Sequence, residues 1–219
     1  APALYIDGYV LIDESSVVNM LKKLSGAEVL GTSGVPSNGF SARFLKRKMR
    51  SAGGFHGNCC MLSSTALQAL KLNKIFLPLG MYRVDGLMGA FLCYGLAPKQ
   101  NHWAPETYIP VTFDATWSVY SDSILTYHKI YGWWLRKFRQ AKGDFENQAL
   151  KYYMRFLNVD LDKLPKNMEE IMLGWKIANA EEYLQLTRRS FFHRRSALEI
   201  ERSFQQSRLD KSDFDIFRL

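Results

Sequence analysis

One carboxylate follows a turn that contains proline and glycine near the middle of the chain. The turn runs from Leu77 to Gly80, Asp85 comes after it, and an apolar run from Gly86 to Tyr94 follows. An aspartate where a loop enters a helix lies near the positive end of the helix dipole, which favours its ionised form. Such a carboxylate can take a proton from a hydroxyl group held beside it, which is general-base catalysis. Asp85 is therefore a candidate catalytic base, and capping of the helix from Gly86 to Tyr94 is its alternative role.

Two earlier loops carry polar side chains that suit ligand binding. Asp7 follows the apolar residues 4–6 and precedes a glycine, a pattern typical of a buried strand that ends or bends at the aspartate. The loop from Gly53 to Asn58 is rich in glycine and leads into an apolar run that predicts a strand. His56 and Asn58 either contact a ligand or make local hydrogen bonds of a turn, and the sequence leaves both roles open.

The composition limits the classes of protein to consider. The chain has 219 residues, 47% of them apolar and 23% charged, which indicates a globular protein with one large domain or a domain with an appendage. Its net charge of +8 favours polyanionic partners. The basic residues are spread over several elements without a nucleic-acid motif, so we expect no nucleic acid as partner. No apolar run is long enough to span a bilayer. Three cysteines, two of them adjacent, do not form a disulfide framework, and a cytoplasmic location is expected.

The order of elements in the first half of the chain indicates an α/β fold. Apolar runs at 4–6, 29–31, 59–62 and 108–113 predict strands, and helical patterns lie between them, with Ser15 or Ser16 expected to cap the first helix. Strands that alternate with helices are typical of a mainly parallel sheet with flanking helices. We therefore predict a first domain over residues 1–119 with this architecture.

The second half of the chain has a different character. Amphipathic helices are predicted from residue 124 to Gly143, over 145–156 and over 180–207, so we predict an all-helical, basic region over residues 120–219. Trp133 and Trp134 lie among four cations of the first of these helices. This helix either lies on an anionic membrane surface or packs on the first domain with its basic residues in solvent. The four cations are Arg136, Lys137, Arg139 and Lys142.

Four segments, taken in order over residues 5–143, resemble the second half of an inverting glycosyltransferase of family 2, which has the GT-A fold. Tyr5–Val10 lies where that family has a strand, an Asp-x-Asp motif and another strand. Gly53–Leu62 resembles its glycine-bearing loop and the strand beside the acceptor. Leu77–Gly86 resembles the acidic motif that carries the catalytic base, and Trp133–Gly143 resembles the basic motif that holds the donor diphosphate.

The resemblance implies transfer of a sugar, with inversion, from a nucleotide-sugar donor to a polysaccharide or a lipid-linked acceptor. Asp85 would be the general base, and Asp7 would be a ligand of Mg²⁺ or Mn²⁺, because departure of a diphosphate requires positive charge on its oxygens. A location in the cytoplasm, peripheral on the inner face of the membrane, would follow. The residues implied to bind the donor diphosphate are Arg136, Arg139 and Gln140, and those implied to bind the acceptor are His56, Gly57 and Asn58.

Three features depart from the pattern of that family. Tyr9 replaces the second aspartate of Asp-x-Asp, and a phenol with a pKa of about 10 is a poor metal ligand near neutral pH. Val84 replaces the acidic residue before the catalytic aspartate. Only six residues precede Asp7, where the family has its nucleotide-binding half. Either a separate chain supplies that half, or the part was removed, or the protein is a catalytically degenerate homologue that acts as a binding or membrane-associated module.

Overall fold

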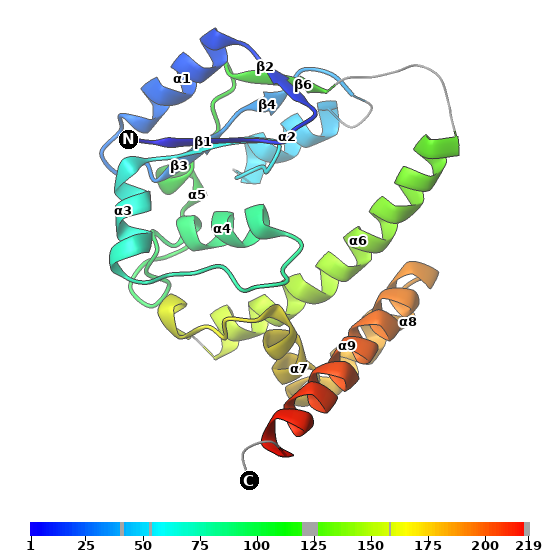
Figure 1. The fold of residues 1–219 in the computed structure, drawn as a ribbon. Helices are drawn as coiled ribbons and strands as arrows, with labels where there is room; N and C mark the ends of the chain where they lie inside the picture. The colour runs from blue at the N-terminus through cyan, green and yellow to red at the C-terminus, as the bar shows by residue number, and fades with distance from the viewer. Residues whose placement is uncertain (40–41, 53, 120–126, 158, 217–219) are drawn as a thin grey trace. The chain divides into compact units, whose positions relative to one another are not determined.

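The computed structural model describes residues 1–39, 42–52, 54–119, 127–157 and 159–216 of the chain (Figure 1). The chain divides into two compact units, and each is described by itself. The first unit comprises residues 1–77, 84–123 and 160–163, and the second comprises residues 78–83, 124–159 and 164–219. The predicted α/β class is confirmed, because small sheets and many helices occur together.

The first unit contains every strand that the described part of the chain forms, together with short helices. The strands are β1 (Ala3–Ile6), β2 (Val10–Ile12), β3 (Gly31–Ser33), β4 (Val35–Pro36), β5 (Cys59–Leu62) and β6 (Thr116–Val119). The helices are α1 (Glu14–Leu24), α2 (Ala42–Ala52), α3 (Ser64–Leu72), α4 (Val84–Cys93) and α5 (Pro105–Tyr108), with a 3₁₀ turn at Leu161–Lys163.

The strands form two three-stranded sheets, with the orders β1-β5-β3 and β2-β6-β4. Strand β5 is antiparallel to both of its neighbours, β2 is antiparallel to β6, and among the described strands only β4 and β6 pair in parallel. The prediction of a mainly parallel sheet is therefore wrong. The reason is that β1 and β3, which point the same way, lie on either side of β5. In the sequence, α1 comes after β1 and before β3. These two strands are parallel to each other, but they are not neighbours in the sheet, because the antiparallel strand β5 lies between them.

Strand β5 is the centre of the first sheet and is buried along its whole length. Cys59 and Met61 pack with Met20 and Trp117 in one core cluster, whereas Leu62 packs in a second cluster around Leu92. Because both faces of the strand are covered, its sequence is an unbroken apolar run rather than an alternating one. The predicted strand at 59–62 is confirmed on this basis.

Two local predictions in this unit are wrong: the residue that caps helix α1 and the strand at 108–113. Helix α1 is capped by Asp13, whose carboxylate accepts the Ser16 N–H at 2.6 Å, so the predicted serine cap is wrong. That hydrogen bond lowers the pKa of Asp13. The segment 108–113 forms no strand, because Pro105 begins helix α5 and the chain continues as a loop. Ile109 and Val111 are buried in the core, and this burial explains their apolar pattern.

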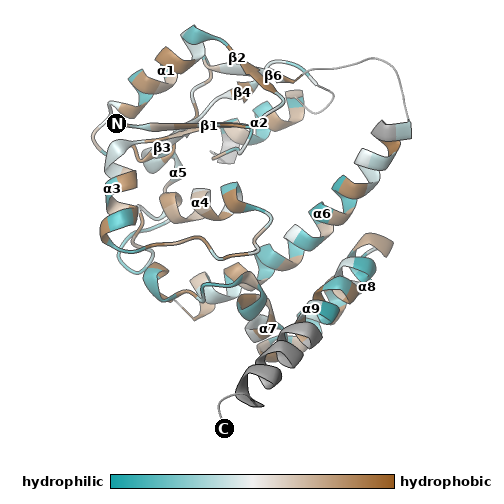
Figure 2. Cartoon of the chain, viewed as in Figure 1, coloured by the Kyte–Doolittle hydropathy of each residue, from teal (hydrophilic) through white to brown (hydrophobic). Residues whose placement is uncertain are grey.

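The second unit is helical in its described residues. Its helices are α6 (Tyr127–Lys151), which continues as a π-helical turn at Tyr152–Phe156, and α7 (Met168–Ala178), α8 (Ala180–Arg188) and α9 (Phe191–Ile216). The predicted start of the first helix at residue 124 lies outside the described residues. Phe145, Trp175 and Tyr183 form an aromatic centre, with the ring of Tyr183 5.2 Å from Phe145 and 5.8 Å from Trp175. Figure 2 shows teal and brown residues interspersed along α6, as expected for an amphipathic helix.

Gly143 does not end a helix, so this prediction is wrong. It lies inside α6, which runs without a break for 25 residues. A Cβ at Gly143 would lie 2.5 Å from Nε of Arg83 and 2.8 Å from its Cδ. The glycine is therefore explained by the Arg83 side chain, which lies directly against the helix backbone. Among the described residues, no helix is both long enough and apolar enough to cross a membrane.

Candidate functional site

Asp85 lies in the first turn of α4 and not at its cap, because the helix begins at Val84. The capping role predicted as the alternative is therefore wrong. The half-buried carboxylate accepts a hydrogen bond from the backbone N–H of Gly57, with 2.9 Å between N and Oδ2. A carboxylate in the first turn also interacts favourably with the helix dipole. The hydrogen bond from Gly57 fixes one oxygen of the carboxylate, Oδ2, beside the loop.

Gly57 has no room for a side chain where it meets Asp85. A Cβ at this position would lie 2.9 Å from Oδ2 and 3.0 Å from Cγ of Asp85, closer than real Cβ atoms approach other heavy atoms. The backbone of Gly57 does not have a positive φ. The glycine is therefore required by the close approach of the carboxylate and not by the conformation of the loop.

His56 is held in one orientation beside this contact. Its backbone N–H donates to Oγ of Ser33 at 2.8 Å, and its ring lies on Trp117 with the centroids 5.5 Å apart. Nδ1 accepts the backbone N–H of Asn58 at 3.3 Å, so the proton of the neutral ring is on Nε2. Burial lowers the pKa of His56, while the nearby carboxylates of Asp85 and Asp7 oppose that shift. The imidazole is therefore a neutral hydrogen-bond donor near both acids.

Asp7 is brought to the same loop by the pairing of β1 with β5. Its backbone N–H donates to the carbonyl of Asn58 at 3.1 Å, one step beyond the ladder pair Ile6 and Cys59. The Val10 N–H then donates to the carbonyl of Asp7 at 3.0 Å and closes a turn. The aspartate itself is exposed to solvent. The pairing of two strands that are distant in sequence therefore fixes the position of Asp7.

Tyr9 lies in this turn and also reaches the loop. Its hydroxyl donates to Oδ1 of Asn58 at 3.2 Å. Asp7, His56, Gly57, Asn58 and Asp85, which the sequence predicted as metal, acceptor and catalytic residues, are thus brought together in the first unit. We call these five residues with Tyr9 the carboxylate–glycine site. Gly53, the first residue of the predicted loop, lies outside the described residues.

The residues predicted to hold a donor diphosphate lie in the second unit. Arg136, Arg139 and Gln140 are exposed on α6. Arg139 lines a groove between α6 and α9, which is described below. Because the two units are described separately, the role of these residues toward the carboxylate–glycine site stays a prediction.

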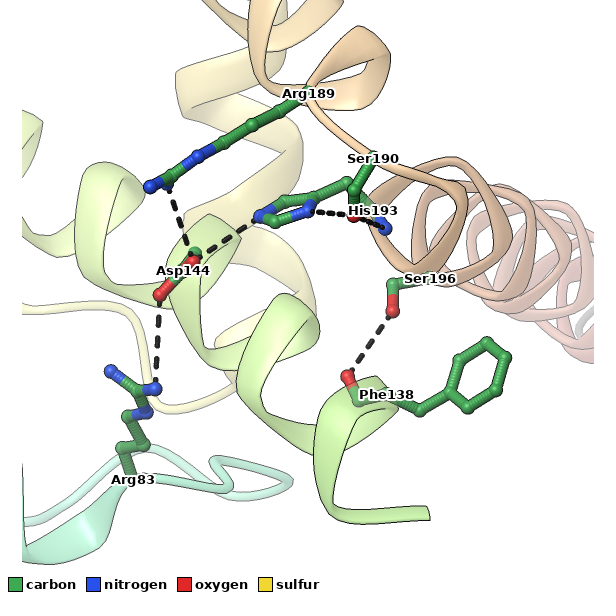
Figure 3. Close-up of polar contacts among 7 residues, drawn as sticks. All are labelled: Arg83, Phe138, Asp144, Arg189, Ser190, His193 and Ser196. Atoms are coloured by element: carbon green, nitrogen blue, oxygen red, sulfur yellow. Dashed lines mark hydrogen bonds and ion pairs between the residues drawn. The ribbon is translucent and has the colours of Figure 1, made fainter. Parts of the chain in front are cut away.

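A second acidic cluster, which the sequence did not predict, lies in the second unit (Figure 3). The carboxylate of Asp144, on α6, is close to three basic side chains. Its oxygens lie 3.7 Å from Nη2 of Arg83, 3.5 Å from Nη1 of Arg189 and 3.2 Å from Nε2 of His193. Nδ1 of His193 is hydrogen-bonded to Oγ of Ser190 at 2.8 Å. The cluster joins α6, the start of α9 and the segment 78–83, and its role is to hold the helical unit together.

Glu146 extends this anchoring on α6. Its side chain is fully buried and accepts the backbone N–H of Tyr82 at 3.1 Å and that of Arg83 at 3.3 Å. Burial raises the pKa of Glu146, while the two N–H donors oppose that shift. The signal in the sequence is a pair of acids, Asp144 and Glu146, just after an otherwise basic helical segment.

Asp7 is the residue of the carboxylate–glycine site that the sequence predicted as a metal ligand. Three or more His, Cys, Asp or Glu side chains do not come together as a metal cluster anywhere in the described ranges. Asp7 supplies one hard oxygen donor, and Mg²⁺ is commonly held by one or two carboxylates together with substrate phosphates and water. Asp7 therefore fits a cation that a bound diphosphate helps to coordinate.

The arrangement combines a carboxylate, a neutral imidazole donor, a side-chain amide and a second acid around a glycine. Among the described residues, the Gly57 N–H is the one hydrogen-bond partner of the Asp85 side chain, so its remaining lone pairs face no donor of the protein. This combination can bind hydroxyl groups and remove a proton from one of them. A scan of protein-family models finds none that matches the sequence, and a search of curated proteins finds no match either.

Proposed function

We propose that the first unit carries the base and the acceptor-binding part of an inverting glycosyltransferase with the GT-A fold. The resemblance over residues 5–143 supports this proposal. The single observation that carries it is the 2.9 Å hydrogen bond from the Gly57 N–H to Asp85, at a place where no Cβ fits. This contact joins the proposed base to the proposed acceptor loop, as a reaction between an acceptor hydroxyl and a carboxylate requires.

In the proposed reaction, Asp85 removes the proton of an acceptor hydroxyl as that oxygen attacks the anomeric carbon of the donor sugar. The nucleoside diphosphate leaves from the opposite face, so the configuration at that carbon is inverted. Gly57 holds one carboxylate oxygen, which leaves the other free to take the proton. His56 donates from Nε2, and the Asn58 amide NH₂ donates while its oxygen accepts from Tyr9, so both side chains can orient acceptor hydroxyls.

The resemblance also assigns residues to donor binding. Asp7 would hold Mg²⁺ or Mn²⁺, which supplies positive charge to the leaving diphosphate. Arg136, Arg139 and Gln140 are the residues that the resemblance assigns to the donor diphosphate. In the resembled family, strands before the Asp-x-Asp segment bind the nucleoside, and a separate chain that supplies such strands is proposed as a partner.

The test is replacement of Asp85 by asparagine in the whole protein that carries this chain. Release of nucleoside diphosphate is measured from UDP-glucose, UDP-galactose, UDP-N-acetylglucosamine and GDP-mannose, with water as the acceptor. We expect the fastest of these rates to fall by about 10²–10⁴-fold, the usual contribution of a general base, with unfolding unchanged. Asp114→Asn is the matched control, because it makes the same change at an exposed aspartate of the first unit. A rate equal to that of the parent in Asp85→Asn would refute the base assignment.

A second candidate is a binding module without turnover. Tyr9 in place of an acid donates its phenol proton to Asn58, and Val84 in place of an acid is 44% exposed beside Asp85. Both replacements remove negative charge from the site. If nucleotide-sugars bind in calorimetry but no diphosphate is released from any of the four donors, this candidate replaces the enzyme.

A further inference from the structure

Four aromatic rings pack α6 against α9 in the second unit. The rings belong to Trp134 and Phe138 of α6 and to Phe191 and Phe192 of α9, and their centroids lie 5.0–6.3 Å apart. The Oγ of Ser196 donates to the carbonyl of Phe138 at 3.3 Å and adds a polar tie between the same helices (Figure 3). The two helices therefore present a joint surface whose shape is fixed.

An open groove of about 620 Å³ lies along this surface. Its apolar lining includes Trp134, Phe138, Phe191 and Leu198. Several of these side chains are strongly exposed: Phe191 is 60%, Leu198 50% and Trp134 40% accessible to solvent. Exposed apolar side chains that gather in a groove with a polar rim make it a candidate binding surface.

The rim of the groove is basic. Arg139, Arg194 and Arg195 line it, and Glu199 is its one acidic residue. Arg195 lies 3.9 Å from Glu199 with both side chains about half exposed, so this ion pair is weak. Arg139 and Arg194 have no carboxylate partner within the described ranges. The rim therefore carries cations that remain available to an external anion.

The nearby Arg189 is different, because it is paired with Asp144. Arg189 is therefore engaged within the protein, whereas Arg139 and Arg194 of the groove are not paired with a carboxylate in the part of the chain that the structure describes. Exposed tryptophan, phenylalanine and leucine side chains favour the boundary between headgroups and acyl chains, and arginine pairs with lipid phosphates.

We propose that the groove between α6 and α9 docks the protein on a bilayer that contains anionic phospholipids. Phe191, Leu198 and Trp134 enter the interface, and Arg194 and Arg195 bind headgroup phosphates. A nucleic acid would favour rows of cations without the exposed leucine and phenylalanine. A second copy of the chain would bring the same basic rim against this one. This inference does not depend on the proposed sugar transfer.

The test is co-sedimentation of the whole protein with vesicles of phosphatidylcholine alone or with phosphatidylglycerol added. We expect binding to the anionic vesicles, weakening with salt, and weaker binding to the neutral ones. Arg194→Glu with Arg195→Glu should weaken binding to anionic vesicles by about tenfold or more, since each basic residue near such a surface contributes substantially. Arg139 is left unchanged because it also has a predicted role toward the donor.

The matched control is Lys151→Glu with Lys166→Glu, which makes the same charge change at exposed lysines of the same unit outside the groove. An equal loss of binding in both double variants would refute the groove, because net charge alone would then explain binding. Circular dichroism checks that each variant is folded.

A second pair of variants tests the apolar part. The double variant Phe191→Ser with Leu198→Ser should weaken binding to anionic vesicles at high salt. The control double variant, Ile177→Ser with Leu184→Ser, should not weaken binding under the same conditions. Ile177 and Leu184 lie in the same unit, and their side chains are 73% and 50% accessible to solvent, similar to those of Phe191 and Leu198. If none of the vesicles binds the parent protein, or if sedimentation shows a dimer that the arginine variant dissolves, the membrane proposal is refuted.

Discussion

The carboxylates of the two units are held in different ways. In the described chain, Asp85 of the first unit has one hydrogen-bond donor, a backbone N–H, and is half-buried. Asp144 of the second unit has three cationic or imidazole partners, and Glu146 accepts two backbone N–H groups while it is fully buried. A carboxylate whose lone pairs are occupied holds elements together, whereas one that is fixed by a single donor can still receive a proton.

This difference separates the acids that anchor the second unit from Asp85, the proposed base. Changes near Asp85 should therefore alter activity more than stability, and changes at Glu146 should do the reverse. Three experiments test this contrast.

The first change is Gly57→Ala, which puts a Cβ 2.9 Å from Oδ2 of Asp85. The carboxylate must move, and displacement of a catalytic group by about 1 Å can cost about 10²-fold in rate. We expect a loss of that size in nucleoside diphosphate release from the best of the four donors named above. Gly54→Ala is the control in the same loop, because its Cβ would meet Met49 at an ordinary 3.5 Å. Equal rates in the two variants would show that the contact does not position the base.

The second change is Glu146→Ala, which empties a fully buried position and leaves the part-buried N–H groups of Tyr82 and Arg83 without their acceptor. An unsatisfied buried group costs about 1–3 kcal/mol, so the free energy of unfolding should fall by about that amount. Urea denaturation measures it. Glu181→Ala, at an exposed glutamate of α8, should change it by less than about 0.5 kcal/mol. If Glu146→Ala is as stable as this control, water replaces the carboxylate and the anchor is not required.

The third experiment follows the stability of the Glu146→Gln variant with pH. Burial raises the pKa of Glu146 above its ordinary value of 4.5, so the folded protein favours the protonated acid. The stabilising contribution of that acid is complete below the ordinary pKa and is lost as the pH rises through the raised value. Relative to Glu146→Gln, the parent should therefore lose stability as the pH rises above about 4.5. The opposite slope would show that the two N–H donors outweigh burial.

The proximity of the residues in the carboxylate–glycine site follows from local signals in the sequence. Asp7 and Gly57 flank short apolar runs that become the adjacent strands β1 and β5, and strand ends that pair bring their flanking residues together. The turn before Asp85 and the apolar run after it likewise predicted the start of α4 to within a few residues. Local patterns were sufficient where the site is built at the ends of regular elements.

The anchoring acids and the strand directions were missed because they depend on contacts between distant segments. Asp144 and Glu146 acquire their roles from Arg83 and the segment before it, about sixty residues earlier in the chain. The sequence predicted that Gly143 ends a helix. That prediction is wrong because the glycine is needed for the packing of Arg83 against it, and no local pattern in the sequence indicates this contact. The directions of the strands likewise depend on where β5 inserts, which no local pattern encodes.

The segment 78–83 has a consequence for how this protein can be divided. The chain leaves the first unit after Leu77, contributes this segment to the second unit, and returns to the first unit at Val84. Glu146 binds two backbone N–H groups of the segment, and Leu79 forms a bridge with Asn167. A cut near residue 119 would therefore not yield two self-sufficient pieces, because the N-terminal product would expose polar backbone of the segment 78–83 that Glu146 and the backbone around Asn167 normally bind. Truncations intended to isolate either unit should keep or replace this segment.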